Sequence, residues 1–194
     1  TEHLKKPNFQ KSKIKQVDAV SNKILFRSKN LKFLDWVAKY NLIDRGNILK
    51  MMLPNSEVFF KELKKKYEMN DELNIRAVNL NNEQLEASNY ISVKMKDKKY
   101  QTLVIDGVPG SGKTEVYFRV IEKNLRLNTQ VLILFPEVSL TSEFVKRVKN
   151  HFGLDPDVWH SKISPSQKKI SLDRIISGKA KIIVGARSAL FLPF

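Results

Sequence analysis

Short aliphatic runs alternate with longer amphipathic stretches in the second half of the chain. The aliphatic runs predict β-strands at 102–106, 130–135, 157–160 and 181–185. Helical spacing of apolar residues predicts helices between them, at about 113–127, 140–151 and 165–177. Strands that alternate with helices in this way indicate an α/β fold, in which helices cover both faces of a parallel sheet.

The first part of the chain has a different, mainly helical pattern. Leu31, Leu34 and Val37 recur at helical spacing, and we expect Gly46 to break the chain before a second apolar run that Pro54 ends. These two helices match a helix-turn-helix of winged-helix type, although the pattern alone favours an ordinary helical hairpin. Further helices are expected at 57–69 and from Asn81 or Asn82 through Tyr90, and the basic start resembles a linker. We therefore divide the chain into a linker or tail of a preceding domain, a winged-helix-like domain and an α/β domain, at 1–27, 28–80 and 81–194.

Composition narrows the class of protein. The 194 residues include 35 Lys and Arg against 20 Asp and Glu, for a net charge of +15, and no cysteine. Without cysteine the chain has no disulfide framework and no cysteine-based zinc site, and its longest apolar run is too short to cross a membrane. The charge indicates a polyanionic partner, first of all nucleic acid. However, 27 of the basic residues are Lys, and Lys-rich composition also follows from an AT-rich genome.

The clearest motif is a glycine-rich segment, Gly107-Val-Pro-Gly-Ser-Gly-Lys113-Thr114, which fits G-x-x-x-x-G-K-[ST] without a mismatch. It follows an expected strand and opens an expected helix, as a phosphate-binding loop does. Its glycines allow backbone N–H groups to face phosphate oxygens. Lys113 would contact the terminal phosphates, and the Thr114 hydroxyl would bind the Mg²⁺ of ATP. The residues expected to bind the nucleotide are Gln84, Gly107, Gly110, Ser111, Gly112, Lys113 and Thr114.

Polar residues elsewhere could complete a site around this loop. Gln84 offers an amide donor and acceptor that suit the edge of adenine, although taken alone it also fits a solvent-facing helix position. Two expected strands end in polar residues, at the edge of a parallel sheet where ligands bind. The residues expected there to contact nucleic acid are Pro136, Glu137, Ser139, Thr141, Arg187 and Ser188. A helix cap at Ser139 or Thr141 and a buried structural role for Arg187 are the alternatives.

Together, four motifs resemble the primosomal protein N′ family, the bacterial replication-restart DNA helicases of superfamily 2. They are the segments 107–117 and 136–141, the pair His160-Ser161, and Gly185-x-Arg187-Ser188-Ala189-x-Phe191-x-Pro193-Phe194. The resemblance is strong over 80–194 and looser over 31–54, which is similar to the region before the helicase core. It implies a RecA-like P-loop lobe in which Gln84 senses adenine and segments 136–141 and 187–188 touch single-stranded DNA. It assigns no role to His160.

The resemblance also implies cofactors, partners and a location. The cofactors are ATP and Mg²⁺, and the partners are forked or single-stranded DNA, primosome proteins and single-stranded-DNA-binding protein, with no membrane. The location is bacterial, cytoplasmic and nucleoid-associated. Zinc belongs to the parent family, in an insertion rich in cysteine that this chain lacks.

The chain departs from the family in what it lacks. The 194 residues contain no Asp-Glu-Glu-His motif, no second lobe and no arginine finger, so the lobe is expected to be incomplete and no catalytic set is complete. We therefore expect a helicase fragment that neither hydrolyses ATP usefully nor unwinds DNA, and whose unpaired strand edges favour aggregation. One alternative is a non-catalytic DNA-binding or primosome-interaction module or a truncated remnant. The other is a different P-loop ATPase or a small-molecule kinase.

Overall fold

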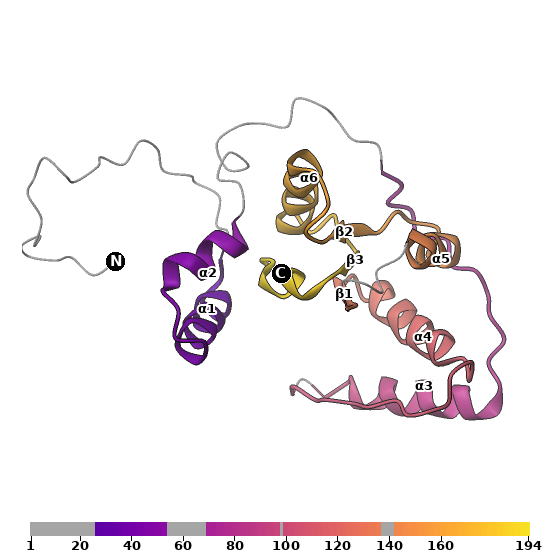
Figure 1. The fold of residues 1–194 in the computed structure, drawn as a ribbon. Helices are drawn as coiled ribbons and strands as arrows, with labels where there is room; N and C mark the ends of the chain where they lie inside the picture. The colour runs from indigo at the N-terminus through magenta and orange to yellow at the C-terminus, as the bar shows by residue number, and fades with distance from the viewer. Residues whose placement is uncertain (1–25, 54–68, 98, 137–141) are drawn as a thin grey trace, which may run out of the picture.

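A parallel sheet with helices on both sides forms the centre of the second half of the chain (Figure 1). The structure is a computed structural model that describes residues 26–53, 69–97, 99–136 and 142–194. The three strands lie in the order β1-β3-β2 and comprise β1 (Val131–Leu134), β2 (Asp157–Trp159) and β3 (Ile182–Gly185). The helices that alternate with them are α4 (Lys113–Arg126), α5 (Ser142–Phe152) and α6 (Pro165–Ile176). The expected α/β class is confirmed, and these strands and helices lie within about two residues of their predicted ranges.

Strand β3 is the buried centre of this sheet. It pairs in parallel with β1 on one side and with β2 on the other. Ile182 and Val184 pack against Phe118 and Phe152 from α4 and α5, whereas Ile183 packs against α6. Because successive side chains of a strand point to opposite faces, a continuous apolar run is what a strand covered on both faces requires.

Two further helices, α1 (Ser28–Tyr40) and α2 (Arg45–Met52), pack together at the start of the described chain. Our expectation that Gly46 breaks the chain is wrong. Gly46 lies in the first turn of α2, and the break comes earlier, where Leu42 has a positive φ of 53°. Asp44 is extended, and its carbonyl accepts the N–H groups of Asn47 and Ile48, which starts α2. A glycine in the first turn leaves this start intact, because the N–H groups there have no partner within the helix.

The strand expected at 102–106 is a second error. These residues lie outside the sheet and form no ladder with any described strand. A strand is defined by hydrogen bonds to a neighbour, and both edges of β3 are occupied by β1 and β2. The remaining edge of β1 is not paired with this segment, so an aliphatic run alone did not make a strand.

The helix expected from Asn81 or Asn82 is present as α3 (Asn82–Lys94), which runs beside α4 (Figure 1). The short 3-10 helix η4 (Arg187–Phe191) follows β3. The helix expected at 57–69 and the start of the chain lie outside the described residues, so the division into three parts stays a prediction. No helix among the described residues has the length and apolar character needed to cross a membrane.

Residues 69–80, which we call the strap, have no regular secondary structure but are fastened to the sheet domain. The N–H groups of Asn74 and Arg76 donate to the carbonyls of Phe152 and His151, at 2.9 and 2.7 Å. The strap also carries Asp71, which pairs with Arg174 of α6. The strap therefore runs from the C-terminal end of α5 to the start of α3, and its hydrogen bonds help to hold the start of α3 in place.

Candidate nucleotide and DNA site

The glycine-rich loop takes the backbone shape that its glycines permit. Gly110 and Gly112 have φ values of +82° and +78°, in the left-handed region that other residues rarely adopt. Gly112 is the residue that precedes α4, so the loop ends where the N–H groups of the first helical turn begin. A helix N-terminus with free N–H groups attracts anions, and the loop therefore has the shape of a phosphate cradle.

The side chain of Lys113 folds back onto the loop and bonds to its backbone. Its Nζ donates to the carbonyls of Gly107 and Val108, at 2.5 and 2.9 Å. A Cβ at Gly107 would stand 2.9 Å from the Ser111 hydroxyl oxygen, so this hydroxyl would have to move to admit a side chain there. The ammonium group, the helix end and the half-buried Thr114 fit a Mg²⁺-bound triphosphate, since they offer a cation, N–H donors and a hydroxyl.

Gln84 is brought to this loop by α3. Its Nε2 donates to the Ser111 carbonyl at 3.1 Å, although the two residues lie 27 positions apart. Its Oε1 accepts from the N–H of Asn81 at 3.0 Å, and Asn81 caps the backbone of Gln84 in return. Gln84 is therefore half-buried, with one structural contact in the cap of α3 and one contact with the loop. Sequence distance hid this contact, because only the packing of α3 on α4 creates it.

A cavity of about 530 Å³ lies between the strap, α3 and α4. This volume is within the range of small-molecule pockets. Glu122 stands on its wall between Arg119 and Arg126, at 2.8 and 3.0 Å. Burial acts to raise the pKa of Glu122, but the hydrogen bonds from both arginines outweigh it and leave the pKa below its ordinary value. Neither Glu122 nor its two arginines belong to a sequence motif, and their only signal in the sequence is the i,i+3 and i,i+4 spacing of opposite charges.

A second cavity, of about 660 Å³, adjoins α4 and α5 on the same side. Here Glu115, the second residue after the loop lysine, pairs with Arg147 of α5. Arg147 also lies over the ring of Phe118, 5.7 Å from its centroid. His151 packs against the rings of Phe118 and Phe152, and burial lowers the pKa of this imidazole. Arg147 and His151 had no motif in the sequence to mark them.

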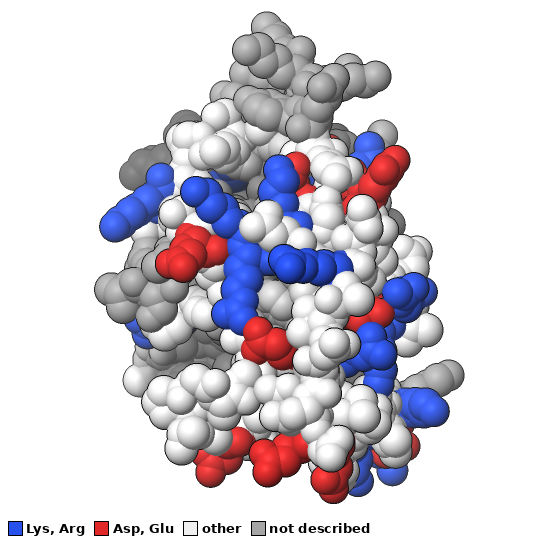
Figure 2. Space-filling view, turned by 90° about the vertical axis from the view of Figure 1, so that its right-hand side faces the viewer, with Lys and Arg blue, Asp and Glu red and all other residues white. Residues whose placement is uncertain are grey.

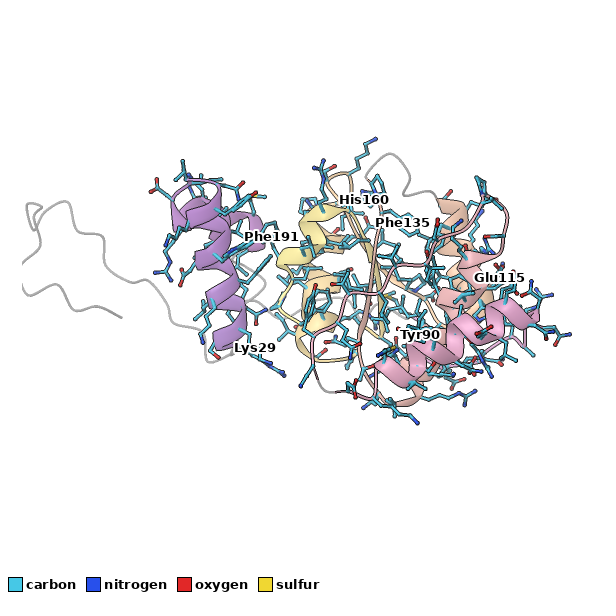
Figure 3. All side chains as sticks on the ribbon, turned by 90° about the horizontal axis from the view of Figure 1, so that it is seen from below. Lys29, Tyr90, Glu115, Phe135, His160 and Phe191 are labelled. Atoms are coloured by element: carbon cyan, nitrogen blue, oxygen red, sulfur yellow. The ribbon has the colours of Figure 1, made fainter. Side chains whose placement is uncertain are left out.

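The carboxyl ends of the three strands meet at one level. Trp159 and Leu134 are both in register with Gly185. The N–H of Phe135 donates to the Gly185 carbonyl, and the N–H of Ala186 donates to the Trp159 carbonyl, each at 2.9 Å. Phe135 and His160 accordingly lie at the same edge of the sheet (Figure 3). Residues that follow these strands therefore share one edge, as ligand-contacting residues of α/β folds do.

This edge holds those of the expected DNA-contacting residues that the structure describes. Pro136 and Arg187 are exposed and Ser188 is half-buried, so the alternative of a buried structural arginine does not hold for Arg187. Gly185 lets β3 turn into η4, because a Cβ there would stand 2.5 Å from the Cβ of Ala189. The other expected residues, Glu137, Ser139 and Thr141, lie outside the described residues.

Basic side chains are unevenly spread over the surface. Figure 2 shows Lys and Arg over the middle of one face, interspersed with some Asp and Glu, and further Asp and Glu along its lower border. The basic residues that line the two cavities are Arg76, Arg119, Arg126, Lys146 and Arg147. Across the described residues, no group of three or more His, Asp or Glu side chains is arranged to hold a metal ion directly.

Two protein families match this chain. Residues 77–194 match the family described as type III restriction enzyme, res subunit. Residues 1–54 match a 3′ DNA-binding domain of PriA, and this match crosses the boundary that we placed between residues 27 and 28.

Several replication restart proteins have sequences similar to this chain. The chain is 36% identical over 185 residues to the replication restart protein PriA of Rickettsia felis, covering 94% of the chain and 27% of that protein. It is 36% identical over 188 residues to PriA of Chlamydia muridarum, covering 97% of the chain and 22% of that protein. PriA of Haemophilus influenzae is 44% identical over 95 residues, which are 49% of the chain and 13% of that protein. The chain thus spans about a quarter of the length of the first two relatives.

Proposed function

The chain belongs to the family of the replication restart protein PriA, and on that premise we propose that it is the ATP-binding part of a 3′–5′ DNA helicase that acts in replication restart. In this proposal α3, α4 and the glycine-rich loop hold the nucleotide. The carboxyl edge of the sheet contacts single-stranded DNA. The parent protein would assemble with primosome proteins and with single-stranded-DNA-binding protein.

One observation carries the nucleotide half of the proposal: the hydrogen bond from Gln84 to the Ser111 carbonyl. It places a side-chain amide beside a phosphate cradle, which is the arrangement that an adenine nucleotide needs for its base and its phosphates. The adenine edge offers a donor and an acceptor, and an amide can pair with both. The cavity between the strap and α4, which is lined by the neighbouring residue Leu85 and by Glu115, would receive the base.

Each residue of the loop has a separate part in binding. Bound ATP would bring Mg²⁺, which neutralises phosphate charge when present. Lys113 would exchange the carbonyls of Gly107 and Val108 for phosphate oxygens, and the first turn of α4 would donate its N–H groups. Gly110 and Gly112 keep side chains out of the way, and the Thr114 hydroxyl would be a ligand of the Mg²⁺ ion. These steps bind and orient the phosphates.

The DNA half rests on the shared edge of β1, β2 and β3. Arg187 is exposed at that edge and supplies a cation for the phosphate backbone, and the Ser188 hydroxyl supplies a hydrogen-bonding group. The match of residues 1–54 to a 3′ DNA-binding domain and the net charge of +15 support DNA as the partner.

We propose further that the chain by itself binds ATP without turning it over at a useful rate. Phosphoryl transfer requires the phosphate cradle together with a group that positions water and a cation that stabilises the transition state. The sequence contains no Asp-Glu-Glu-His motif to place that water. DNA-stimulated ATP hydrolysis by the 194-residue chain would contradict this part.

The binding proposal is tested by titrating a fluorescent ATP analogue with Mg²⁺. We expect Lys113→Ala to weaken binding at least about tenfold, since a point charge on the terminal phosphates is worth about 1.4 kcal/mol or more. Lys123→Ala is the matched control, because Lys123 lies on the same helix and donates to Ser92 at 2.8 Å, away from the loop. Gln84→Ala should reduce the preference for ATP over GTP.

This titration, combined with a DNA-binding assay and an ATPase assay, separates the alternatives. If Lys113→Ala binds as tightly as the wild type, the nucleotide site is wrong. DNA binding without any nucleotide binding would instead favour a non-catalytic DNA-binding module. ATP turnover that depends on a small acceptor and not on DNA would favour a small-molecule kinase.

A further inference from the structure

Helix α1 carries a row of aromatic rings on one side. Phe33, Trp36 and Tyr40 are spaced by three and four residues, which places them on one stripe of the helix. The rings of Phe33 and Trp36 are stacked with centroids 6.1 Å apart, and those of Trp36 and Tyr40 are stacked with centroids 5.3 Å apart. We call these three residues the α1 aromatic row.

Trp36 and Tyr40 lie outside the core of the α1–α2 pair, whereas Phe33 is half-buried, packs against that core and has its ring centroid 5.8 Å from that of Phe191 in η4. The core is formed by Leu34, Val37 and Ala38 of α1 with Ile48 of α2. Trp36 and Tyr40 retain 59% and 74% of their accessible surface. Burying them would stabilise the protein, so their exposure on a surface indicates an interaction site rather than a folding role.

Lysines flank the aromatic row. Lys29 lies on α1 four residues before Phe33, and Figure 3 shows it on this helix. Lys32 precedes Trp36 by four residues and Lys39 follows it by three, so both border the same stripe. The one acidic residue of α1, Asp35, is paired with Arg45 at 2.6 Å. The surface around the rings is therefore positive.

Exposed rings within a positive border are the combination that binds single-stranded nucleic acid. Bases stack on aromatic rings whatever their sequence, and lysines attract the phosphates between them. We propose that the α1 aromatic row is a stacking platform for the bases of single-stranded DNA. The match of residues 1–54 to a 3′ DNA-binding domain includes the whole row, which favours DNA over a protein as the occupant. The stacking platform depends on the proposed helicase function only in that both take DNA as the ligand. It requires neither nucleotide binding nor DNA contacts at the edge of the sheet.

The first test measures the affinity of the whole chain for a labelled oligothymidine by fluorescence anisotropy, without nucleotide. Trp36→Ala and Tyr40→Ala should each weaken binding roughly five- to a hundredfold, the range found when a stacking ring is removed. Tyr90→Ala is the matched control and should change affinity less than about twofold. Tyr90 is as exposed as Trp36, at 59%, and lies on a different helix, α3. Circular dichroism would verify that each variant folds.

The second test separates base stacking from phosphate attraction. An abasic oligonucleotide of the same length keeps the phosphates but offers no ring to stack. The wild type should bind it more weakly than oligothymidine, and this difference should be smaller for Trp36→Ala, which keeps only the stacking ring of Tyr40 exposed. Trp36 also reports directly, because the other tryptophan, Trp159, is only 3% exposed. Oligothymidine should therefore quench the exposed tryptophan emission.

Three outcomes would overturn the proposal. They are equal binding of abasic and normal DNA by the wild type, unchanged affinity in both ring variants, and unchanged tryptophan emission on DNA binding. If DNA still binds in any of these cases, the helicase proposal survives and only the stacking platform fails. If no DNA binds at all, the DNA half of the proposed function fails with it.

Discussion

Gly110 and Gly112 have nearly the same backbone conformation but different surroundings. Both have φ near +80°, at +82° and +78°. A Cβ at Gly110 would meet nothing within 4 Å, whereas a Cβ at Gly112 would collide with the side-chain amide of Gln84. The two positions therefore separate the energy of a left-handed backbone from the energy of the contact between loop and α3.

We expect Gly110→Ala to lower the free energy of unfolding by about 1 kcal/mol, the usual strain of an alanine at positive φ. Gly112→Ala should lower the free energy of unfolding by more, because the Gln84 side chain must also give up its hydrogen bonds to Ser111 and Asn81. Urea denaturation of both variants measures the difference. In a Gln84→Ala background, the two glycine substitutions should become equally destabilising. If they differ as much as before, Gln84 is not what Gly112 accommodates.

His151 makes stability depend on pH. Burial lowers the pKa of His151 in the folded protein below its ordinary value of about 6.5. As the pH falls through that ordinary value, the unfolded chain takes up the proton first, so the folded state loses stability. We expect His151→Phe, which keeps a ring against Phe118 and Phe152, to lose less stability than the wild type between about pH 7 and pH 5. Parallel curves of unfolding free energy against pH would contradict this.

At the scale of elements, Arg174 joins α6, β2 and the strap. Its guanidinium donates to both oxygens of Asp71 in the strap and, through Nε, to Asp157 at 3.1 Å. Arg174 and Asp157 are buried, whereas Asp71 is half-exposed. Burial raises the pKa of Asp157, and the charge of Arg174 opposes that rise. We therefore expect the buried pair Arg174–Asp157 to contribute more to the stability of the fold than the contact between Arg174 and Asp71 does.

Removing the buried cation should be costly. We expect Arg174→Met to lower the unfolding free energy by about 3–5 kcal/mol, since it leaves the carboxylate of Asp157 buried without its cationic partner. Asp71→Asn should cost about 1 kcal/mol or less, because water screens its half-exposed carboxylate. Adding Asp157→Asn to Arg174→Met should recover part of the loss. Urea denaturation measures all three, and equal losses for the Arg174 and Asp71 variants would refute the ranking.

Elements were predictable where their own residues decide them. The Asn81 cap was enough to place the start of α3, although the helix runs four residues beyond the expected Tyr90, and the aliphatic runs at β1 and β3 were enough to place those strands. The segment 102–106 was not predictable in this way, because a strand also needs an edge to pair with. The prediction that the chain breaks at Gly46 failed for a related reason. The start of α2 is set by the extended backbone and the carbonyl of Asp44, not by the nearby glycine.

At the scale of the whole molecule, the sheet has a free edge. One side of β1 pairs with β3, and no described strand pairs with the other side. The apolar groove of about 610 Å³ along that side is lined by β1, α4 and the segment 102–106. An unpaired apolar edge is a template for association with another chain.

We expect the chain to aggregate in a concentration-dependent way, and a lysine on the edge strand to slow this. Leu134→Lys should lower the rate of light-scattering growth severalfold, because a charge on an edge strand opposes pairing. Leu190→Lys is the matched control, since Leu190 lies on η4 and is exposed to a similar degree, 46% against 41%. A monomeric protein that melts sharply without any substitution would contradict the premise.

Local chemistry was enough to identify the glycine-rich loop, most helices and the three paired strands, because periodicity, caps and left-handed glycines act within a few residues. Packing decided the rest. Gln84 meets Ser111 across 27 positions, Arg174 meets Asp71 across 103, and the ends of three strands meet at one level. Such contacts depend on how elements are oriented after the core forms, and no local pattern records that orientation. The α1 aromatic row depends on both local chemistry and packing. Its spacing can be read from the sequence, but the exposure of Trp36 and Tyr40 follows from the structure, in which Leu34 and Val37 are among the residues of α1 that face α2.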